Sequence, residues 1–269
     1  MAPIVLYSTR RTPAGRAVEL TAKMIGIELD VQYIDLAKKE NMTEEYLKMN
    51  PMHTVPTVND NGVPLYDSHA IIIYLVQKYA KDDTLYPAKD LVKQANINAM
   101  LHFESGVLFA RLRWILEPVF YWGQTEVPQE KIDSVHKAYD LLEATLKTSG
   151  TDYLVGRTIT LADISVSTSL CTLNALFPAD ASKYPLVLAY LKRLEQTMPH
   201  YQEINTDRAN EALQLYNQKL GKYGSSCMRR IQAVIFGNLD SSSGTTPTSV
   251  AMLEMQLKSA IVRLSPTMY

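Results

Sequence analysis

The hydrophobic pattern changes its period near residue 85, and this change constrains the fold more than any other feature of the sequence. Before that point, short apolar runs predict strands, with one amphipathic stretch between the first two. The expected order is a strand at 4–7, a helix at 13–25, a strand at 29–35, a hairpin of 54–59 with 63–66, and a helix after Ser68. Because the chain opens as strand, helix, strand, we expect an α/β first domain.

Beyond Pro87 the strand signals stop, and apolar residues recur three and four apart, notably over 92–122 and 130–147. The second domain should therefore be all helical. At 269 residues the chain is long enough for two modest domains, which we place at 1–81 and 88–220. Residues 221–269 change in composition, and a Ser-, Gly- and Thr-rich connector precedes a weakly amphipathic segment at 250–264. We expect this tail to be poorly packed.

Composition excludes several classes of partner. The formal net charge is −1, and Lys and Arg are interspersed with acids, so we expect no nucleic acid partner. No apolar stretch approaches membrane-spanning length, and the run after Met1 is too short for a signal peptide, so we expect no membrane insertion. Cys171 and Cys227 form no disulfide framework or ligand motif. A reducing, cytoplasmic setting is expected.

Two segments offer backbone groups for a small anionic peptide. In the segment 50–58, a cis Val55–Pro56 bond would leave the Val55 amide and carbonyl free to pair with an extended peptide. Ser68 directly precedes an apolar helical run, so we expect it to be an N-cap with free amides behind it. A carboxylate is favoured at such a helix start.

The most specific motifs are 50–58, 67–74, 102–111 and 158–163, and with residues 7–19 they resemble the glutathione S-transferases. The likeness is to the insect delta and epsilon classes, most nearly epsilon, and it spans about the first four fifths of the chain. It implies a thioredoxin-like N-terminal domain followed by an all-α domain. It also implies glutathione as co-substrate, hydrophobic electrophiles as second substrates, and a homodimer in which the first domain of one chain contacts the helical domain of the other.

The catalytic hydroxyl is assigned to Thr12 by this resemblance. Physically, Thr12-Pro13 suits a helix N-cap followed by proline at the first helical position. The family's catalytic hydroxyl stands at this place and is usually serine in the delta and epsilon classes. Ser8 and Thr9 are weaker candidates, and we expect Tyr7 to pack at the strand end. Lowering a thiol pKa by about two units requires ~2.7 kcal/mol, which one charged hydrogen bond and a helix N-terminus can supply without a metal.

The resemblance assigns glutathione binding to Asn41, His53, Thr54, Val55, Pro56, Asp67, Ser68 and Arg113. Asp67 would hold the α-ammonium group, and Ser68 the carboxylate of the same glutamyl arm. His53 would hold the glycyl carboxylate, although a lone turn histidine more often serves a structural hydrogen bond. Asn41 stands where epsilon enzymes tend to have a second histidine, and its amide can donate to the same carboxylate.

The hydrophobic acceptor site is assigned to Phe109, Leu112, Leu116, Phe120, Tyr121, Leu213 and Tyr216. From spacing alone, such a stripe would predict helix core. Arg113 would lie at the edge of the cleft and could pair with Glu117 one turn further on. Asp163 is not expected to be an active-site acid, because with Thr160 it forms a capping-box pattern.

The resemblance implies a transferase that attaches the glutathione thiolate to electrophilic hydrophobic molecules in xenobiotic detoxification. The same thiolate would serve dehydrohalogenation and hydroperoxide reduction, and insecticides would be among the electrophiles. Two alternatives belong to other classes: a non-catalytic carrier of hydrophobic ligands, and an interaction protein that keeps only the fold. The intact Val55-Pro56, Asp67-Ser68 and His53 argue against the second alternative.

Overall fold

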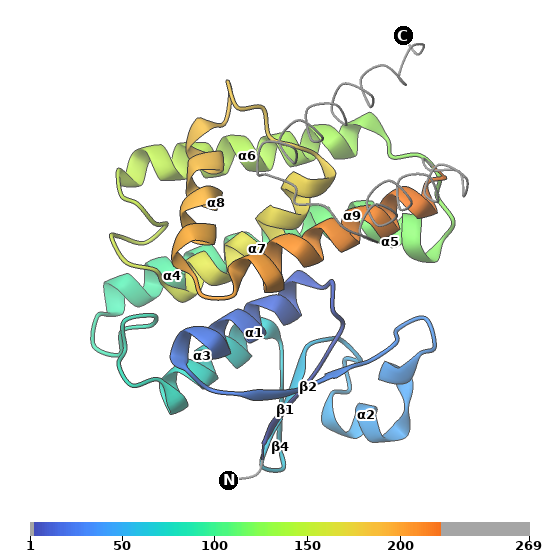
Figure 1. Cartoon of the computed structure of the whole chain (residues 1–269), viewed down its shortest axis with the longest axis vertical. Coiled ribbons are helices and arrows are strands. Elements are labelled where there is room, and N and C mark those ends of the chain that lie inside the picture. The colour runs from blue at the N-terminus through green and yellow to red at the C-terminus, as the bar shows by residue number, and fades with distance from the viewer. Residues whose placement is uncertain (1–2, 222–269) are drawn as a thin grey trace, which may run out of the picture. The chain divides into compact units, whose positions relative to one another are not determined.

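The computed structural model describes residues 3–221, which belong to one compact unit. In it a four-stranded sheet is followed by a set of packed helices (Figure 1). The expected α/β domain followed by a helical domain is confirmed. The predictions for Cys227 and for the tail beyond residue 221 lie outside the described residues.

The sheet has the strand order β2-β1-β3-β4, with β2 parallel to β1 and the other neighbours antiparallel. Its strands are β1 Ile4–Ser8, β2 Leu29–Tyr33, β3 Thr57–Asp60 and β4 Val63–Tyr66. β2 ends before the predicted Asp35, because the Asp35 carboxylate accepts the Ala37 amide at 2.9 Å and turns the chain. The hairpin turns at Asn61 and Gly62, which both have positive φ, as tight hairpins require.

The helices of the first half are α1 Pro13–Ile25, α2 Glu44–Met49 and α3 Ser68–Tyr79, with a short 3₁₀ turn at Glu40–Met42. The sequence predicted α1 and α3 but not α2, which is only six residues long. At the start of α1 the backbone lies directly against β1. A side chain at Gly15 would collide with the Ser8 hydroxyl, so this close approach requires glycine.

The regular elements of the second half are all helices within the described residues. Its elements are α4 Leu91–Phe103, α5 Ala110–Tyr121, α6 Gln129–Ser149, α7 Leu161–Leu176, α8 Pro185–Thr197 and α9 Asp207–Lys219, with π-helical segments η2 Glu104–Phe109 and η3 Gln202–Thr206. The helix predicted at 92–122 is therefore interrupted by a π-helical segment. That segment contains Gly106, a poor helix former, and the buried Glu104.

Asp163 caps α7, as expected. One of its carboxylate oxygens accepts the Thr160 amide at 2.8 Å, and the other accepts the Leu154 amide at 2.9 Å and the Tyr190 hydroxyl at 3.0 Å. Burial raises the pKa of Asp163, although these hydrogen bonds oppose the shift. Both oxygens of the Asp163 carboxylate are therefore hydrogen-bonded within the fold and fix the start of a buried helix.

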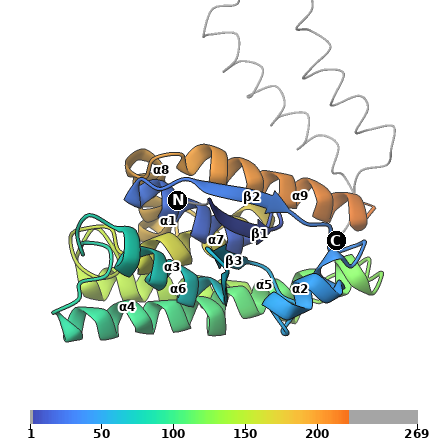
Figure 2. The ribbon, with the colours of Figure 1, turned by 90° about the horizontal axis from the view of Figure 1, so that it is seen from below.

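The two halves meet where α1 packs against α7, as both views of the ribbon show (Figures 1 and 2). Arg16 is fully buried there and donates to the Asn205 side chain at 2.7 Å and to the Thr168 carbonyl at 3.0 Å. Burial lowers the pKa of Arg16 to about 10. A second contact joins Arg208 of α9 to Glu19 of α1 at 2.7 Å. Within residues 3–221, no helix is long and apolar enough to cross a membrane.

Candidate active site

Strand register brings the predicted binding segments to one end of the sheet. Tyr7 of β1 is paired with Thr57 of β3, and Thr57 is paired with Tyr66 of β4. The loop that leads to Thr12 therefore follows one strand, Val55 precedes the next, and Asp67 with Ser68 follows the third. Because neighbouring strands are about 4.8 Å apart, these segments lie side by side. The N-termini of α1 and α3 begin at the same edge, so two positive helix ends meet there.

Thr12 is the N-cap residue of α1, with Pro13 at the first helical position, as predicted. Its hydroxyl does not cap the helix and forms no hydrogen bond with any other residue of the described part of the chain. The residue is half-buried. A hydroxyl that is free, partly shielded from water and next to a helix N-terminus can donate a hydrogen bond to a bound anion.

Of the neighbouring side chains, Ser8 is hydrogen-bonded within the fold and the Tyr7 ring is packed. Ser8 is fully buried and donates to the Thr9 carbonyl at 3.3 Å, so it cannot reach a ligand. The Tyr7 ring packs edge-on against Tyr46 with 6.1 Å between ring centroids, as expected for a residue at the strand end. The burial and hydrogen bond of Ser8 favour Thr12 over Ser8.

The loop before β3 is held from beneath by two buried side chains. Asn50 donates to the Thr54 carbonyl at 2.9 Å, and the Tyr46 hydroxyl donates to the same oxygen at 2.6 Å. The Val55–Pro56 bond is cis, as predicted. Within residues 3–221, the Val55 amide and carbonyl form no hydrogen bond. Val55 can thus pair with an extended peptide.

His53 and Asn41 are joined to each other. His53 adopts a positive φ of 47°, and its carbonyl accepts the Asn41 side-chain amide at 2.6 Å. The imidazole of His53 is exposed and forms no hydrogen bond inside the described range. Asn41 thus supports the His53 loop with one amide hydrogen, and its second hydrogen is available to a carboxylate.

The start of α3 differs from the prediction. Asp67, not Ser68, is the N-cap: one of its carboxylate oxygens accepts the amides of His69 at 2.9 Å and Ala70 at 3.1 Å. Both residue types are good caps, and Asp67 takes the position because it adopts the non-helical φ of 72°. Ser68 becomes the first helical residue. Its amide and hydroxyl stay unbonded across residues 3–221, and so does the second carboxylate oxygen of Asp67.

A buried cluster behind this helix start was not found from the sequence. His69 Nε2 lies 3.0 Å from Glu104 Oε2 and 2.8 Å from the Ser165 hydroxyl. The Ser169 hydroxyl donates to the other oxygen of Glu104. The side chains of His69 and Glu104 are 14% and 7% exposed. The cluster ties the start of α3 to the helical half, and no local sequence signal indicates it.

The predicted acceptor residues divide into two groups. Leu112 and Tyr216 are each only 2% exposed and belong to the core, and their assignment to a cleft lining stays a prediction. Tyr216 packs edge-on against Phe177, with ring centroids 6.2 Å apart. Both side chains pack in the hydrophobic core, where α5 and α9 contact their neighbours.

The other acceptor residues keep accessible surface. Phe109, Leu116, Phe120 and Leu213 are half-buried and pack against the edge of the core, while Tyr121 at the end of α5 is 60% exposed. Because α5 contacts α9, Leu213 lies on a helix that neighbours the helix of Leu116, Phe120 and Tyr121. This group offers an apolar surface. That the surface lies beside Thr12 stays a prediction.

Arg113 pairs with Glu117, as expected, with 2.5 Å between Arg113 Nε and the carboxylate. The arginine side chain is 60% exposed. Within residues 3–221, Arg113 makes no polar side-chain contact besides this pair. Its role beside a ligand stays a prediction.

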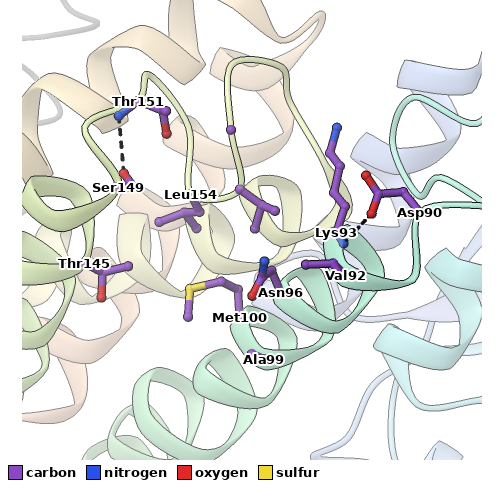
Figure 3. A pocket seen from close by; sticks show the side chains of 12 residues that line it. Asp90, Val92, Lys93, Asn96, Ala99, Met100, Thr145, Ser149, Thr151 and Leu154 are labelled. Atoms are coloured by element: carbon purple, nitrogen blue, oxygen red, sulfur yellow. Dashed lines mark hydrogen bonds between the residues drawn. The ribbon is translucent and has the colours of Figure 1, made fainter.

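A groove of about 550 Å³ lies elsewhere, along α4 (Figure 3). Its wall opposite α4 is made by the end of α6 and the loop at 151–156. None of the predicted site residues lines it. The candidate site is therefore the sheet edge and not this groove.

Chemically, the sheet edge offers a set of free groups that suits a small peptide. Free backbone groups at Val55 suit an extended main chain, and the free amide and hydroxyl of Ser68 suit a carboxylate at a helix start. The free oxygen of Asp67 suits an ammonium group. The Thr12 hydroxyl remains free to donate to a further acceptor.

Comparison with known proteins identifies the family. Residues 2–77 match the model for the glutathione S-transferase N-terminal domain, and residues 119–199 match the model for the C-terminal domain. Glutathione S-transferase 1 of Manduca sexta is 41% identical over 196 residues, which cover 72% of this chain and 88% of that protein.

Solved structures agree with the family models. An epsilon-class glutathione S-transferase from the housefly, Musca domestica, is 43% identical, with a TM-score of 0.77 over 80% of this chain and 98% of that chain. A glutathione transferase homolog from Drosophila mojavensis, solved with bound glutathione, is 44% identical, with a TM-score of 0.77 over 81% and 98%. The chain therefore belongs to the glutathione S-transferase family, with a thioredoxin-like N-terminal domain, a helical C-terminal domain and close similarity to the epsilon class of insects.

Proposed function

We propose that this protein is a glutathione transferase that attaches the glutathione sulfur to electrophilic, hydrophobic small molecules. The observation that carries the proposal is the Thr12 hydroxyl, which is free, half-buried and at the N-terminus of α1. The names of the relatives, all glutathione S-transferases, support the same activity.

Thr12 acts by stabilising the thiolate. A free thiol has a pKa of about 8.5, and a shift of about two units corresponds to ~2.7 kcal/mol. A hydrogen bond to a charged group supplies ~1.5 to 3 kcal/mol, and a helix N-terminus adds ~0.3 to 1 kcal/mol. The two groups present are sufficient for the shift. The thiolate then attacks the electrophile, and the enzyme contributes ionisation and proximity.

Glutathione is oriented by contacts at both of its ends. Val55 pairs with the cysteinyl backbone, while Asp67 holds the α-ammonium group and Ser68 the adjacent carboxylate. His53 holds the glycyl carboxylate with its exposed imidazole, and Asn41 positions that loop. Thr54 and Pro56 shape the loop around Val55. The homolog from Drosophila mojavensis that was solved with bound glutathione supports this ligand.

The electrophile is placed against accessible apolar side chains of η2, α5 and α9, with Arg113 at the edge. The members are Phe109, Leu116, Phe120, Tyr121 and Leu213. An apolar surface selects hydrophobic molecules, which fits detoxification of xenobiotics, insecticides among them. The same thiolate serves dehydrohalogenation and the reduction of organic hydroperoxides.

The enzyme is proposed to work as a cytoplasmic homodimer. Exposed apolar residues on β4 and at the start of α4 support a contact between the first domain of one chain and the helical domain of the other. They are Val63, Tyr66, Leu91 and Val92, which are 41% to 73% exposed. Light scattering coupled to size exclusion would give twice the chain mass of 30.3 kDa, and a mass of one chain would refute the dimer.

Substitution at Thr12 tests the function. We expect turnover of a halogenated nitroaromatic with glutathione by the wild type and by Thr12→Ser, and loss of nearly all turnover in Thr12→Val, which keeps the shape but lacks the hydroxyl. Equal turnover in Thr12→Val would remove the hydroxyl from the mechanism. Retention on immobilised glutathione without turnover by the wild type would favour a carrier.

A further inference from the structure

The turn that carries Thr12 is tied to α9 by an ion pair. Residues 9–12 connect β1 to α1, and Arg10 lies in this turn, two residues before Thr12. Arg10 Nε donates to both carboxylate oxygens of Glu211, each at 3.0 Å, across 201 positions of the chain. Glu211 belongs to α9, the helix that also carries Leu213. The pair therefore links the loop of the candidate catalytic hydroxyl to a helix of the apolar acceptor surface.

The turn itself is closed by long hydrogen bonds. The Thr12 amide donates to the Thr9 carbonyl at 3.3 Å, and the Ser8 hydroxyl donates to the same carbonyl at 3.3 Å. Both distances exceed the usual range for hydrogen bonds of their kind. The two ends of the turn are held more closely, because the Ile34 amide donates to the Ser8 carbonyl at 2.9 Å and the Arg16 amide to the Thr12 carbonyl at 3.1 Å. A contact from outside the turn thus adds a constraint where the turn is weakest.

Glu211 is held in position by the way α9 packs on the first half. Arg208 lies three residues earlier, on the same face of the helix, and pairs with Glu19 of α1 at 2.7 Å. That pair is buried, with side chains only 5% and 8% exposed, whereas Arg10 and Glu211 are 47% and 34% exposed. The buried pair anchors α9, and the outer pair extends from this anchor to the turn.

Arg11 shows that the link is specific to one of two neighbouring arginines. It follows Arg10 directly and is exposed, and its side chain forms no ion pair or hydrogen bond within residues 3–221. The turn therefore keeps one uncompensated positive charge, while Glu211 neutralises the other and restricts where its side chain can lie. Because Glu211 is an acid, its effect on position and its effect through charge have opposite signs at a nearby thiolate.

We propose that Arg10 and Glu211 are positioning residues, whose ion pair holds the turn so that the Thr12 hydroxyl can donate to the sulfur of bound glutathione. The proposal deepens the transferase function and rests on it. The two residues act through Thr12 and not on the substrate. The expected effect is that of one exposed ion pair, a ~2- to 5-fold change and not a complete loss.

The test is Glu211→Gln in the full-length protein, a change that keeps the side-chain shape and the helix propensity but weakens the pair. In an ultraviolet titration of the glutathione complex, the pKa of the bound thiol should be ~0.3 to 0.7 higher than in the wild type, which is a ~2- to 5-fold change in its ionisation constant. Charge alone predicts the opposite, because removing a carboxylate and leaving Arg10 uncompensated would favour the thiolate.

Kinetics give a second measurement. At pH 6 and saturating substrates, turnover of the nitroaromatic should be ~2- to 4-fold lower in Glu211→Gln, because a smaller fraction of the bound thiol is ionised. The KM for glutathione should stay at its wild-type value, since the groups that hold the peptide follow other strands. A purely structural pair would alter stability and leave the thiol pKa unchanged.

Charge reversal and a matched control complete the experiment. Arg10→Glu should raise the thiol pKa, and the double variant Arg10→Glu/Glu211→Arg should bring it back toward the wild-type value by restoring the pair. Glu28→Gln is the control, because it weakens the exposed pair with Lys23 at the same 3.0 Å separation but at the other end of α1, about 20 Å away. It should leave the thiol pKa and turnover unchanged.

The proposal is overturned by an unchanged or lower thiol pKa in Glu211→Gln, or by a double variant that recovers nothing relative to Arg10→Glu. A wild-type complex whose thiol ionises as in free solution would instead refute the transferase function itself. The two failures are therefore distinguishable in the same titration.

Discussion

Asp67 has two roles in the structure, and two substitutions separate them. One carboxylate oxygen caps α3 through the amides of His69 and Ala70, and the other is free for the α-ammonium group of glutathione. Asn caps a helix as well as Asp does and tolerates the positive φ of 72°, so Asp67→Asn removes the charge and keeps the cap. Asp67→Ala removes both.

The expected magnitudes follow from these contacts. A hydrogen bond to a charged group contributes ~1.5 kcal/mol at its weaker end, which corresponds to a ~10-fold change in affinity. Asp67→Asn should therefore raise the KM for glutathione ~10-fold with little change in saturated turnover or stability. Asp67→Ala should raise KM by at least as much and lower the free energy of unfolding by ~1 to 3 kcal/mol, from the lost cap and from alanine at positive φ.

Steady-state kinetics with varied glutathione, combined with urea unfolding of each variant, measures both quantities. Asp90→Ala is the control, because Asp90 caps α4 through the Lys93 amide at 2.9 Å and lies on the groove of Figure 3. It should lose ~1 kcal/mol of stability and keep the wild-type KM. A wild-type KM in Asp67→Asn, or a fall in turnover without a change in KM, would refute the binding role of this carboxylate.

Two further predictions concern buried polar groups. Burial raises the pKa of Asp60, but hydrogen bonds from Lys78, Tyr74 and Tyr79 at 2.6 to 2.7 Å outweigh it and hold the pKa below its usual range. The stability that the Asp60 carboxylate contributes is present above its unfolded pKa of about 3.9 and is lost as pH falls toward its folded pKa. In urea unfolding, Asp60→Asn should therefore have a much lower free energy of unfolding than the wild type at pH 7, and this difference should narrow at about pH 3. A constant difference would contradict this. Glu104→Ala should lower the free energy of unfolding by ~1 to 3 kcal/mol, because it leaves Ser169 without its acceptor and His69 with the Ser165 hydroxyl alone. An unchanged midpoint in the same assay would refute that account.

Local signals explain what the sequence could predict. The strand, helix, strand opening depends on hydrophobic period, and the cap of α7 depends on Thr160 and Asp163, only three residues apart. Likewise, Thr12-Pro13 marked the start of α1 by residue type alone. These features are determined within a few residues, so a single sequence is enough to find them.

What the sequence could not predict depends on distant partners or on backbone angles. The π-helical segment places Glu104 against His69, 35 positions earlier, and against Ser169, 65 positions later. No local pattern records such a contact. Asp67 and Ser68 are both good caps, and only the φ of 72° at Asp67 decides between them. Leu112 follows the same helical spacing as Leu116, and only the packing of the surrounding helices makes it core.

The most direct test of the account is the pKa of the glutathione thiol in the complex, measured by ultraviolet absorbance of the thiolate as pH is varied. With Thr12 as the donor at the start of α1, the bound thiol should ionise about two pH units below its solution value of about 8.5, and Thr12→Val should move its pKa back toward that value. A bound thiol that ionises as it does in free solution, or one whose pKa does not respond to Thr12→Val, would contradict the central claim.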